Sequence, residues 1–412
     1  MAKKILLATT VKWPSAPRLA GAFTSLGCRV EAVFPRGHML QVSRYLSRGY
    51  TYRPLYPLSS LAASIAAAKP DLIVPCDDRA VTHLLALHAV AHDTEISVLL
   101  ERSLGRIDSY PVIMGRSSAM EAAQAEGIVA PLTVPVTEET ELSSALKLIG
   151  FPAVLKADQS WGGDSVAIVR TPDEVHRAFR KLSGAPSRLR SLVRSVLRKD
   201  AHFLRAAWAP KAITVHVQRF IPGKPATTAF ACRDGEMLAS LSVDVVEWRN
   251  ATGPACLIKR ADCPAMDDAA RRIARRFGLS GLHGLDFVRD EAGTPHLIEM
   301  NPRATQICHL VLEPGNDLAA ALAEEQPRPI TTDASAVALF PQAWARDLRG
   351  PSFPGAFEDV PWDDPAVLHT IAGRKLVVAP RSQPAGGVMA SSTRPILTDE
   401  RSSPVRAMRK AG

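Results

Sequence analysis

The stretch that decides the fold is HGLDFVRDEAGTPHLIEMNPR, residues 283–303. Two apolar runs, 282–288 and 295–300, flank the turn-forming residues 290–293. Apolar runs separated by a short turn that contains Asp and Gly are typical of two antiparallel strands. The stretch therefore predicts a β-hairpin.

The hairpin brings two carboxylates together. With residues 292–293 as a two-residue loop, Asp286 lies opposite Glu299 on the neighbouring strand. Like charges in this position destabilise a sheet unless a cation lies between them. Asn301 shares the face of Glu299, and three oxygen ligands suit Mg²⁺, which takes its remaining ligands from water and substrate phosphates. A surface hairpin with scattered acids is the alternative interpretation.

The other face of the second strand is predicted to be buried. Side-chain alternation directs Ile298 and Met300 away from the carboxylates and into a core. The hairpin thus separates an acidic face, which can hold a cation, from an apolar face, which can pack.

Asp286 followed by Glu299-x-Asn301-x-Arg303, on a strand, turn and strand, resembles the metal-binding end of an ATP-grasp domain. The resemblance implies that Asp286, Glu299 and Asn301 hold one or two Mg²⁺ or Mn²⁺ ions on the phosphates of ATP. It also implies that Arg303 faces the phosphorylated intermediate. The resemblance extends over residues 113–322, which is about half of the chain.

Composition and length indicate a globular protein of several domains. The chain has 412 residues, of which 46% are hydrophobic, enough for a large core. The apolar run 5–8 is too short for a signal peptide, and no run is long enough to span a membrane. Six scattered cysteines without a CxxC pair favour a reduced, cytoplasmic setting.

The first 95 residues alternate between strand-like and helix-like stretches, which predicts a parallel βαβ sheet. The expected strands and helices are 4–8, 16–26, 28–34, 58–68 and 71–74. The first strand is not followed by G-x-G-x-x-G, and a Walker A motif is missing, so a nicotinamide or P-loop enzyme is disfavoured.

The end of the last of these strands carries two acids. Ligands of open α/β sheets gather at such strand ends, so Asp77 and Asp78 can belong to a site. Capping of the following helix is the favoured interpretation. His83, His88 and His92 are predicted to fall on that helix, on a half-exposed face rather than on a metal.

Two basic residues suit phosphate binding. Ser118-x-x-Glu121 predicts a capping box, with Arg116 just before the helix N-terminus, where a cation and free N–H groups favour an anion. Lys156 ends an apolar strand, 151–156, and a lysine there needs an anion. The resemblance implies that both bind ATP phosphates, Arg116 standing where the family commonly has lysine.

Residues 158–165 predict a glycine-rich loop before a strand at 166–169. Glycines allow backbone N–H groups to approach phosphate oxygens and allow a loop to close as a lid, although a plain turn uses the same residues. The resemblance implies a phosphate-covering hairpin. Its candidate cofactor-binding residues are Trp161, Gly162, Gly163 and Ser165.

The strand at 215–221 resembles the adenine-binding segment of the family. The resemblance implies that Gln218 and backbone groups of Arg219, Phe220 and Ile221 bind the base. The family commonly has an acid for the ribose a few residues downstream, but residues 224–226 are Lys, Pro and Ala.

A basic insert at 185–211 lies outside the resemblance. Apolar residues at helical spacing within 187–199 alternate with arginines, which predicts a basic amphipathic helix. Docking onto its own domain is the favoured interpretation, and an acidic partner or an anionic membrane surface is the alternative. Interleaved aromatic residues, which would favour nucleic acid, are missing.

The chain is therefore predicted to combine α/β and α+β parts. The expected parts are a Rossmann-like pre-ATP-grasp domain (1–112), an ATP-grasp domain (113–330, with a nucleotide lobe to 225 and a metal-binding lobe from 226), a C-terminal subdomain (331–380) and a disordered tail (381–412).

The predicted function is an ATP-dependent ligase that joins a carboxylate to an amine or other nucleophile through an acylphosphate and releases ADP and phosphate. Lys156 and Arg303 are the candidate catalytic residues. A phosphotransferase of the same fold and a non-catalytic ATP-binding or membrane-docking module are the alternatives. Retention of Arg303 beside the metal ligands argues against a pure binding module.

Overall fold

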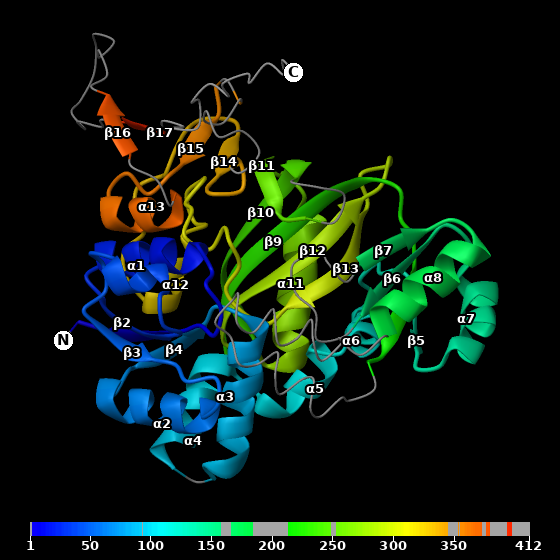
Figure 1. Ribbon diagram of the computed structural model, residues 1–412, viewed down its shortest axis with the longest axis horizontal. Coiled ribbons are helices and arrows are strands. Elements are labelled where there is room, and N and C mark those ends of the chain that lie inside the picture. Colours follow the sequence, from blue (N-terminus) through cyan, green and yellow to red (C-terminus); the bar gives the residue numbers. More distant parts are fainter. Residues whose placement is uncertain are drawn as a thin grey trace, which may run out of the picture.

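The computed structural model describes residues 2–92, 94–157, 166–183, 213–248, 253–344, 353, 355–372, 376–379 and 394–397. In Figure 1 a parallel sheet with its helices lies at the left, a large sheet in the centre and a small lobe at the right. The mixed α/β and α+β fold expected from the sequence is confirmed. The predicted basic insert lies outside the described residues.

The N-terminal part is a parallel sheet, as predicted, with four strands in the order β3-β2-β1-β4. Strand β3 was not predicted. Ile5, Leu6 and Leu7 are all buried, because helices cover both faces of the sheet. The strands are β1 Lys4–Ala8, β2 Arg29–Phe34, β3 Arg48–Thr51 and β4 Leu72–Pro75. The helices are α1 Ser15–Ser25, η1 Met39–Val42, α2 Pro57–Ala68, α3 Asp78–Val90 and α4 Glu95–Leu104.

A seven-stranded sheet occupies the centre, in the order β13-β12-β9-β10-β11-β14-β15. Helix α11 packs on one face and α12 on the other, where α12 also contacts α1. The strands are β9 Lys224–Arg233, β10 Glu236–Trp248, β11 Ala255–Arg260, β12 Gly281–Arg289, β13 Pro295–Asn301, β14 Val337–Leu339 and β15 Phe357–Asp359. The helices are α11 Pro264–Phe277 and α12 Leu318–Ala323.

The predicted pairing of Asp286 with Glu299 is confirmed, although the turn differs from the predicted one. Arg289 pairs with Pro295, and the Gly293 N–H donates to the Asp290 carbonyl at 2.9 Å, so the turn is one residue longer than expected. A β-bulge next to Asp286 adds one residue to β13 and restores the register of the carboxylates.

The same bulge makes the prediction for Ile298 wrong. Leu297 and Met300 are the buried residues of this strand, whereas Ile298 is half-buried. Ile298 is the extra residue of the bulge, so simple alternation fails at this point. Met300 lies in the core, as predicted.

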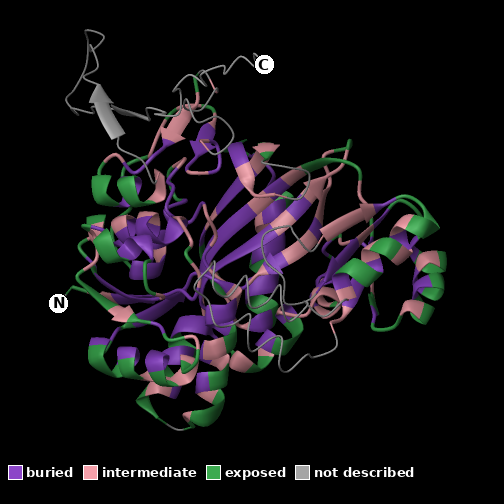
Figure 2. Cartoon of the chain, viewed as in Figure 1, coloured by how far each residue is buried: buried purple, intermediate pink, exposed green. Residues whose placement is uncertain are grey.

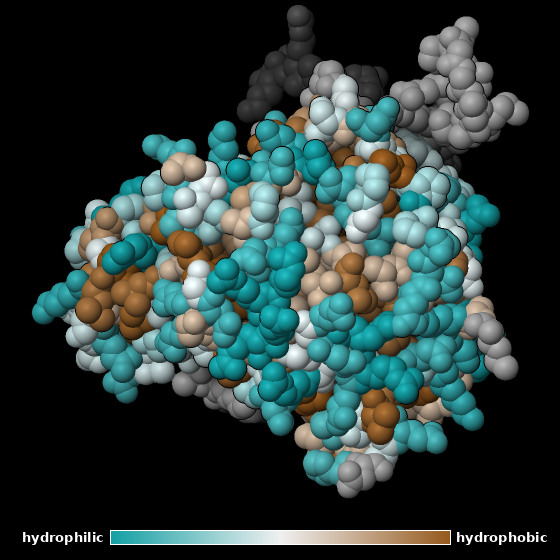
Figure 3. All heavy atoms as spheres, turned by 180° about the vertical axis from the view of Figure 1, so that it is seen from behind, coloured by the Kyte–Doolittle hydropathy of each residue, from teal (hydrophilic) through white to brown (hydrophobic). Residues whose placement is uncertain are grey.

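The small lobe is a four-stranded antiparallel sheet in the order β5-β8-β6-β7, covered by α7 and α8. Its elements are β5 Thr133–Val136, η3 Glu139–Glu141, α7 Leu142–Ile149, β6 Ala153–Ala157, β7 Val166–Val169, α8 Pro172–Ser183 and β8 Val215–Arg219. In Figure 3, which shows the molecule from behind, hydrophobic residues gather on this lobe at the left. Leu148 and Phe151 are among its exposed side chains.

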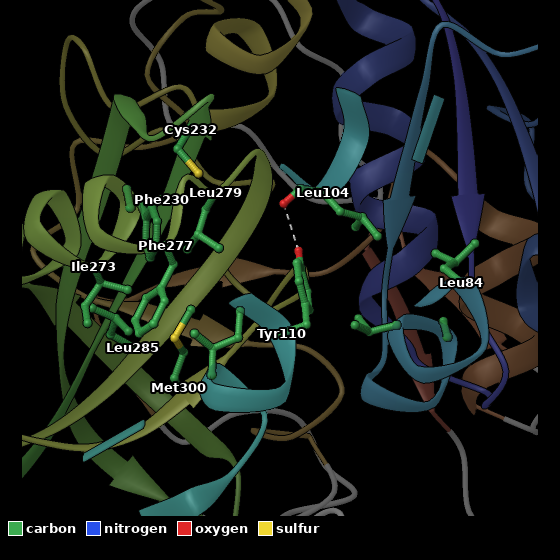
Figure 4. Packing of buried hydrophobic residues seen from close by; sticks show 14 of the residues in the cluster. Leu84, Leu104, Tyr110, Phe230, Cys232, Ile273, Phe277, Leu279, Leu285 and Met300 are labelled. Carbon is green, nitrogen blue, oxygen red and sulfur yellow. Dashed lines mark hydrogen bonds between the residues drawn. The ribbon is translucent and has the colours of Figure 1, made fainter. Parts of the chain in front are cut away.

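One continuous core joins the N-terminal sheet to the large sheet. It runs from Leu84 on α3 through Tyr110 to Met300 on β13 (Figure 4). The buried Tyr110 hydroxyl donates to the Leu104 carbonyl at 3.0 Å. The connecting helices are η2 Ile107–Ser109, α5 Tyr110–Ile113 and α6 Arg116–Ala125. Figure 2 shows this buried interior between the two sheets, and it fixes α3 relative to the hairpin.

Residues after 330 return to the other parts rather than stand apart. Strands β14 and β15 extend the large sheet, and Asp359 accepts from Arg18 at 2.5 Å and pairs with His309 at 2.9 Å. Helix α13 Pro365–Ala372 follows. Strands β16 Leu376–Ala379 and β17 Arg394–Leu397 pair with each other, the second within the tail expected to be disordered.

Two general expectations can be compared with the structure. All six cysteines are buried and free, which agrees with the predicted lack of a disulfide framework. Among the described residues, the helices are too short or too polar to cross a membrane.

Candidate functional site

A cavity of about 250 Å³ lies where the small lobe, α6, the hairpin and α3 meet. It is lined by Asp78, Thr82, Ile113, Met114, Gly115, Arg116, Ala119, Met120, Thr133, Lys156, Gln218, Ile298, Glu299, Met300, Asn301 and Pro302. The predicted residues Arg116, Lys156, Gln218, Glu299 and Asn301 therefore surround one space.

Strand alternation in the small lobe directs Lys156 into this cavity. Leu155 and Ala157 face the core of the lobe, so Lys156 points the other way, toward the hairpin. Its ammonium donates to the Ile298 carbonyl at 2.9 Å, which the bulge presents to it. Burial lowers the pKa of Lys156 to about 8, while Glu299 opposes that shift.

Gln218 lies on the cavity face of β8, next to the strand that carries Lys156. It is buried, and its amide donates to the Thr133 hydroxyl at 2.9 Å. Thr133, on β5, also lines the cavity, and sequence reasoning missed it. A side-chain amide and a hydroxyl at this end can hydrogen-bond a polar heterocycle.

Arg116 reaches the cavity from the first turn of α6. The helix begins at Arg116 itself, after an extended Gly115, so the predicted capping box is wrong. Ser118 lies inside the first turn, where its hydroxyl donates to the Val112 carbonyl at 2.8 Å and is not free to cap. The Arg116 guanidinium donates to Glu299 at 3.0 Å.

The pKa values of the two carboxylates of the hairpin are shifted in opposite directions. Burial, and then the nearby Glu299, raise the pKa of Asp286. Burial also opposes ionisation of Glu299, but Arg116, Lys156 and Arg303 together lower its pKa. Glu299 is therefore the strongly anionic member of the pair.

These oxygen donors fit a hard cation such as Mg²⁺. Asp286 and Glu299 are directly opposed, and Asn301 donates from its amide nitrogen to Asp286 at 2.9 Å. The amide oxygen of Asn301 accepts from Arg303 at 3.0 Å, so it could bind a cation only after Arg303 moves away. Within the described parts of the chain, His, Cys, Asp and Glu side chains form no cluster of three or more that could hold a metal. An ion here would need further ligands from phosphate and water.

Arg303 lies beside this group, between the hairpin and α3. Its guanidinium donates to Asp78 at 3.1 Å and to the Asn301 side-chain oxygen at 3.0 Å. Burial opposes its charge, but Asp78 raises the pKa of Arg303, so it stays protonated. The Ala304 N–H donates to the Pro75 carbonyl at 3.0 Å, which ties this segment to the end of β4.

Both interpretations of the paired acids after β4 hold, one for each residue. Asp77 is the N-cap of α3 and accepts from the Ala80 N–H at 2.9 Å, as favoured from the sequence. Asp78 lines the cavity. The sequence located these acids at a ligand-binding edge but did not identify Asp78 as a partner of Arg303, because a contact between residues so far apart in the sequence has no local signal.

Several predicted residues are not brought to the cavity. Arg219, Phe220 and Ile221 are absent from its described lining, and the N–H groups of Arg219 and Phe220 already donate to carbonyls of the same lobe. The placement of His92 on α3 is wrong, because the helix ends at Val90. Trp161, Gly162, Gly163 and Ser165 lie outside the described residues.

Residues 120–306 match the family model of the ATP-grasp domain. This part of the chain is an ATP-grasp domain. This match covers β5 to β13 together with most of α6, the elements that surround the cavity apart from α3 and α5.

Curated relatives of the chain include two carboxylases. The chain is 28% identical over 219 residues to a biotin carboxylase of a Nostoc species, covering 49% of this chain and 42% of that protein. It is 24% identical over 179 residues to acetyl-CoA carboxylase 2 of Oryza sativa subsp. japonica, covering 43% of this chain and 7% of that protein. The matches thus span less than half of either relative.

Solved structures share the fold over most of the chain. A biotin carboxylase from Campylobacter jejuni, described as a β-γ-ATP complex, has a TM-score of 0.57 at 14% identity and covers 80% of this chain and 72% of that one. An L-amino acid ligase from Bacillus licheniformis has a TM-score of 0.56 at 15% identity, covering 78% and 75%. At such identities the similarity establishes the fold.

Proposed function

We propose that this chain is an ATP-dependent ligase that joins a carboxylate to an amine, with Mg²⁺ or Mn²⁺ on the nucleotide phosphates. One observation carries the proposal. Lys156 and Arg116 enter one cavity from different elements and face Glu299 and Asn301 of the hairpin. Two cations and a cluster of oxygen donors are what a metal-bound triphosphate requires.

The reaction proceeds in two displacements. A carboxylate oxygen attacks the γ-phosphorus, the bond to the bridging oxygen breaks, and ADP leaves. The amine nitrogen then attacks the carbonyl carbon of the acylphosphate, the carbon–oxygen bond breaks, and phosphate leaves with that oxygen. Positioning and charge neutralisation supply most of the catalysis in phosphoryl transfer, so a nucleophilic side chain is not required.

The residues divide this work by position. Lys156 and Arg116 bind the phosphates, and Gln218 binds at the base end. Arg303 holds the substrate carboxylate with its two-pronged guanidinium and then stabilises the transferring phosphoryl group. Asp286, Glu299 and Asn301 would hold the metal ion, which would supply further charge neutralisation.

The glycine-rich loop at 158–165 is proposed as a lid from its sequence. Trp161, Gly162, Gly163 and Ser165 precede β7, which begins at Val166 and pairs with β6 beside Lys156. This position supports a role in covering the phosphates. The backbone at 219–221 is retained as a proposed adenine contact.

The proposal is tested by ADP release against a panel of the twenty amino acids and short mono- and dicarboxylates, with hydroxylamine as a trap. A ligase should give ADP and the hydroxamate of one carboxylate in equal amounts. A phosphorylated product that accumulates without hydroxamate would show a phosphotransferase. ATP binding without ADP release from any panel member would support a non-catalytic module.

A further inference from the structure

The cavity contains a carboxylate that the phosphate chemistry does not use. Asp78 is the first residue of α3, at the C-terminal end of β4, where parallel sheets bind ligands. It lines the cavity with Thr82, and its side chain is 25% exposed. Among the described residues, its side chain has one partner, the Nε of Arg303 at 3.1 Å.

The adjacent acid cannot play the same part. Asp77 accepts from the Thr9 hydroxyl at 3.0 Å and from the Thr10 N–H at 2.6 Å, besides capping α3. The buried Arg79 donates to the Thr10 hydroxyl at 2.8 Å and so belongs to this inner network. Asp77 is therefore structural, and Asp78 is the member of the pair that faces the cavity.

Charge at this end of the cavity favours a cation. Asp78, Asp77 and Asp286 all act on the single guanidinium of Arg303. The phosphate end instead has two cations, Lys156 and Arg116, which act on Glu299, while Asp286 acts on both Lys156 and Arg303. A positively charged acceptor is thus attracted to the side of Asp78, away from the lysine and arginine that bind phosphate.

Arg303 connects the two substrates. It touches Asp78 on one side and Asn301 of the hairpin on the other. If Arg303 turns to the substrate carboxylate, Asp78 loses the guanidinium that now lies 3.1 Å away. An ammonium group can take the place of the guanidinium with no change in the net charge beside Asp78.

We propose that Asp78 is a catalytic residue that binds the ammonium group of the acceptor and removes its proton. This inference rests on the ligase function proposed above. One N–H bond of the acceptor ammonium group breaks, and its proton moves to an oxygen of the Asp78 carboxylate. The lone pair left on the nitrogen attacks the carbonyl carbon of the acylphosphate. Phosphate leaves and takes the second proton that the nitrogen loses on forming the amide. The N-terminal domain thus supplies the base, and the ATP-grasp domain supplies the phosphoryl chemistry.

The test compares two small nucleophiles in wild type and Asp78→Asn, with the carboxylate that releases most ADP. Ammonium must lose a proton before it attacks, whereas hydroxylamine is already neutral at pH 7. We expect Asp78→Asn to lower amide formation from ammonium by about 10²-fold or more. Hydroxamate formation should fall by less than about tenfold, because Arg303 keeps its charge.

Three results would overturn this assignment in distinguishable ways. Equal loss with both nucleophiles would make Asp78 a positioning residue for Arg303 alone. Unchanged rates with both would remove it from the site. A wild-type chain that gives no hydroxamate with any carboxylate would overturn the ligase function and this inference with it. Asp173→Asn, in the first turn of α8, is the matched control for loss of a helix-terminal acid and should leave both rates unchanged.

Discussion

The two ends of the cavity differ in their balance of charged side chains. At the phosphate end, cations from the small lobe and α6 are satisfied by Glu299 and by the Ile298 carbonyl. At the other end, acids from the N-terminal sheet and the hairpin surround the one guanidinium of Arg303. In the proposed reaction, phosphate oxygens replace the internal acceptors at the first end, and the ammonium group of the acceptor replaces the guanidinium of Arg303 at the second.

This difference teaches how one cavity can keep two charged substrates apart. An anion near Lys156 meets a buried ammonium, whereas near α3 it meets Asp78 and is attracted only through the guanidinium of Arg303. Buried charges need partners at every stage, and both ends have partners that a substrate can replace. The order of events along the cavity thus follows from its charge pattern.

The largest effect on activity is expected when Glu299, at the phosphate end of the cavity, loses its charge. Glu299→Gln removes the charge that Arg116 and the metal share, without loss of volume, so ADP formation should fall by about 10³-fold. Release of ADP measured by a coupled assay checks this. Glu291→Gln, on the exposed turn of the same hairpin, is the control and should be fully active. Normal turnover of the Glu299 variant would remove this site from the reaction.

A smaller loss of turnover is expected when Arg303, which lies between the two ends, is replaced. Arg303→Lys keeps the charge beside Asp78 but loses the fork that holds a carboxylate, so turnover should fall by about 10²-fold. ATP affinity measured by calorimetry should stay within a few-fold of wild type. Arg289→Lys, which is paired with Asp244 on the same hairpin, should change neither quantity. Loss of ATP affinity in the Arg303 variant would assign this residue to the nucleotide instead.

The phosphate end should also respond to pH through Lys156. With a pKa lowered to about 8 by burial, Lys156 is charged at pH 7 and becomes neutral as pH rises through 8. ATP affinity should therefore decrease from pH 7 to pH 9. Lys156→Met should lower affinity by about 10- to 100-fold at pH 7 and flatten this profile. Lys147→Met, exposed on α7, is the control, and a variant that keeps the wild-type profile would contradict the assignment.

The smallest effect concerns the core that joins the two ends. Burial lowers the pKa of His283 to about 4 from an ordinary value of 6.5, so the unfolded chain takes up the proton first as pH falls. Stability is fully present above pH 6.5 and should be lost between pH 6.5 and 4, by roughly 3 kcal/mol at most.

Replacement of this histidine sharpens that test. His283→Phe keeps the ring packed against Phe230 and should make the acid-side loss of stability shallower in urea unfolding at several pH values. His369→Phe, exposed on α13, should leave the slope unchanged. An identical slope for wild type and the His283 variant would place the acid sensitivity elsewhere, for example at His38, whose pKa burial lowers to about 3.

Local patterns predicted the hairpin, the parallel sheet and most of the phosphate end. Periodicity fixed β1 and β7 to the residue, and opposed carboxylates located the pair Asp286 and Glu299. The bulge at Ile298 was not predictable, because an extra residue in a strand leaves no compositional signal. The sequence predicts a two-residue turn, whereas the turn is one residue longer and shifts the pairing by one residue. The bulge shifts it back, so Asp286 still pairs with Glu299.

The other end could not be read from the sequence in the same way. Asp78 and Arg303 are 225 residues apart, and their contact depends on how the N-terminal sheet packs on the hairpin through a shared core. Arg116 shows the same limit, since its partner Glu299 lies 183 residues away. Residue types and strand ends identified the candidates, whereas tertiary packing decided their partners.

In the proposed reaction, the carboxylate of one substrate becomes an acylphosphate, a mixed anhydride, before the amine attacks. Its most direct test uses a carboxylate labelled with ¹⁸O in both oxygens, together with ATP, Mg²⁺ and the accepted amine. If Arg303 delivers a carboxylate oxygen to the γ-phosphorus, one ¹⁸O atom should appear in each inorganic phosphate released, as detected by mass spectrometry. Unlabelled phosphate formed together with the amide would contradict this account.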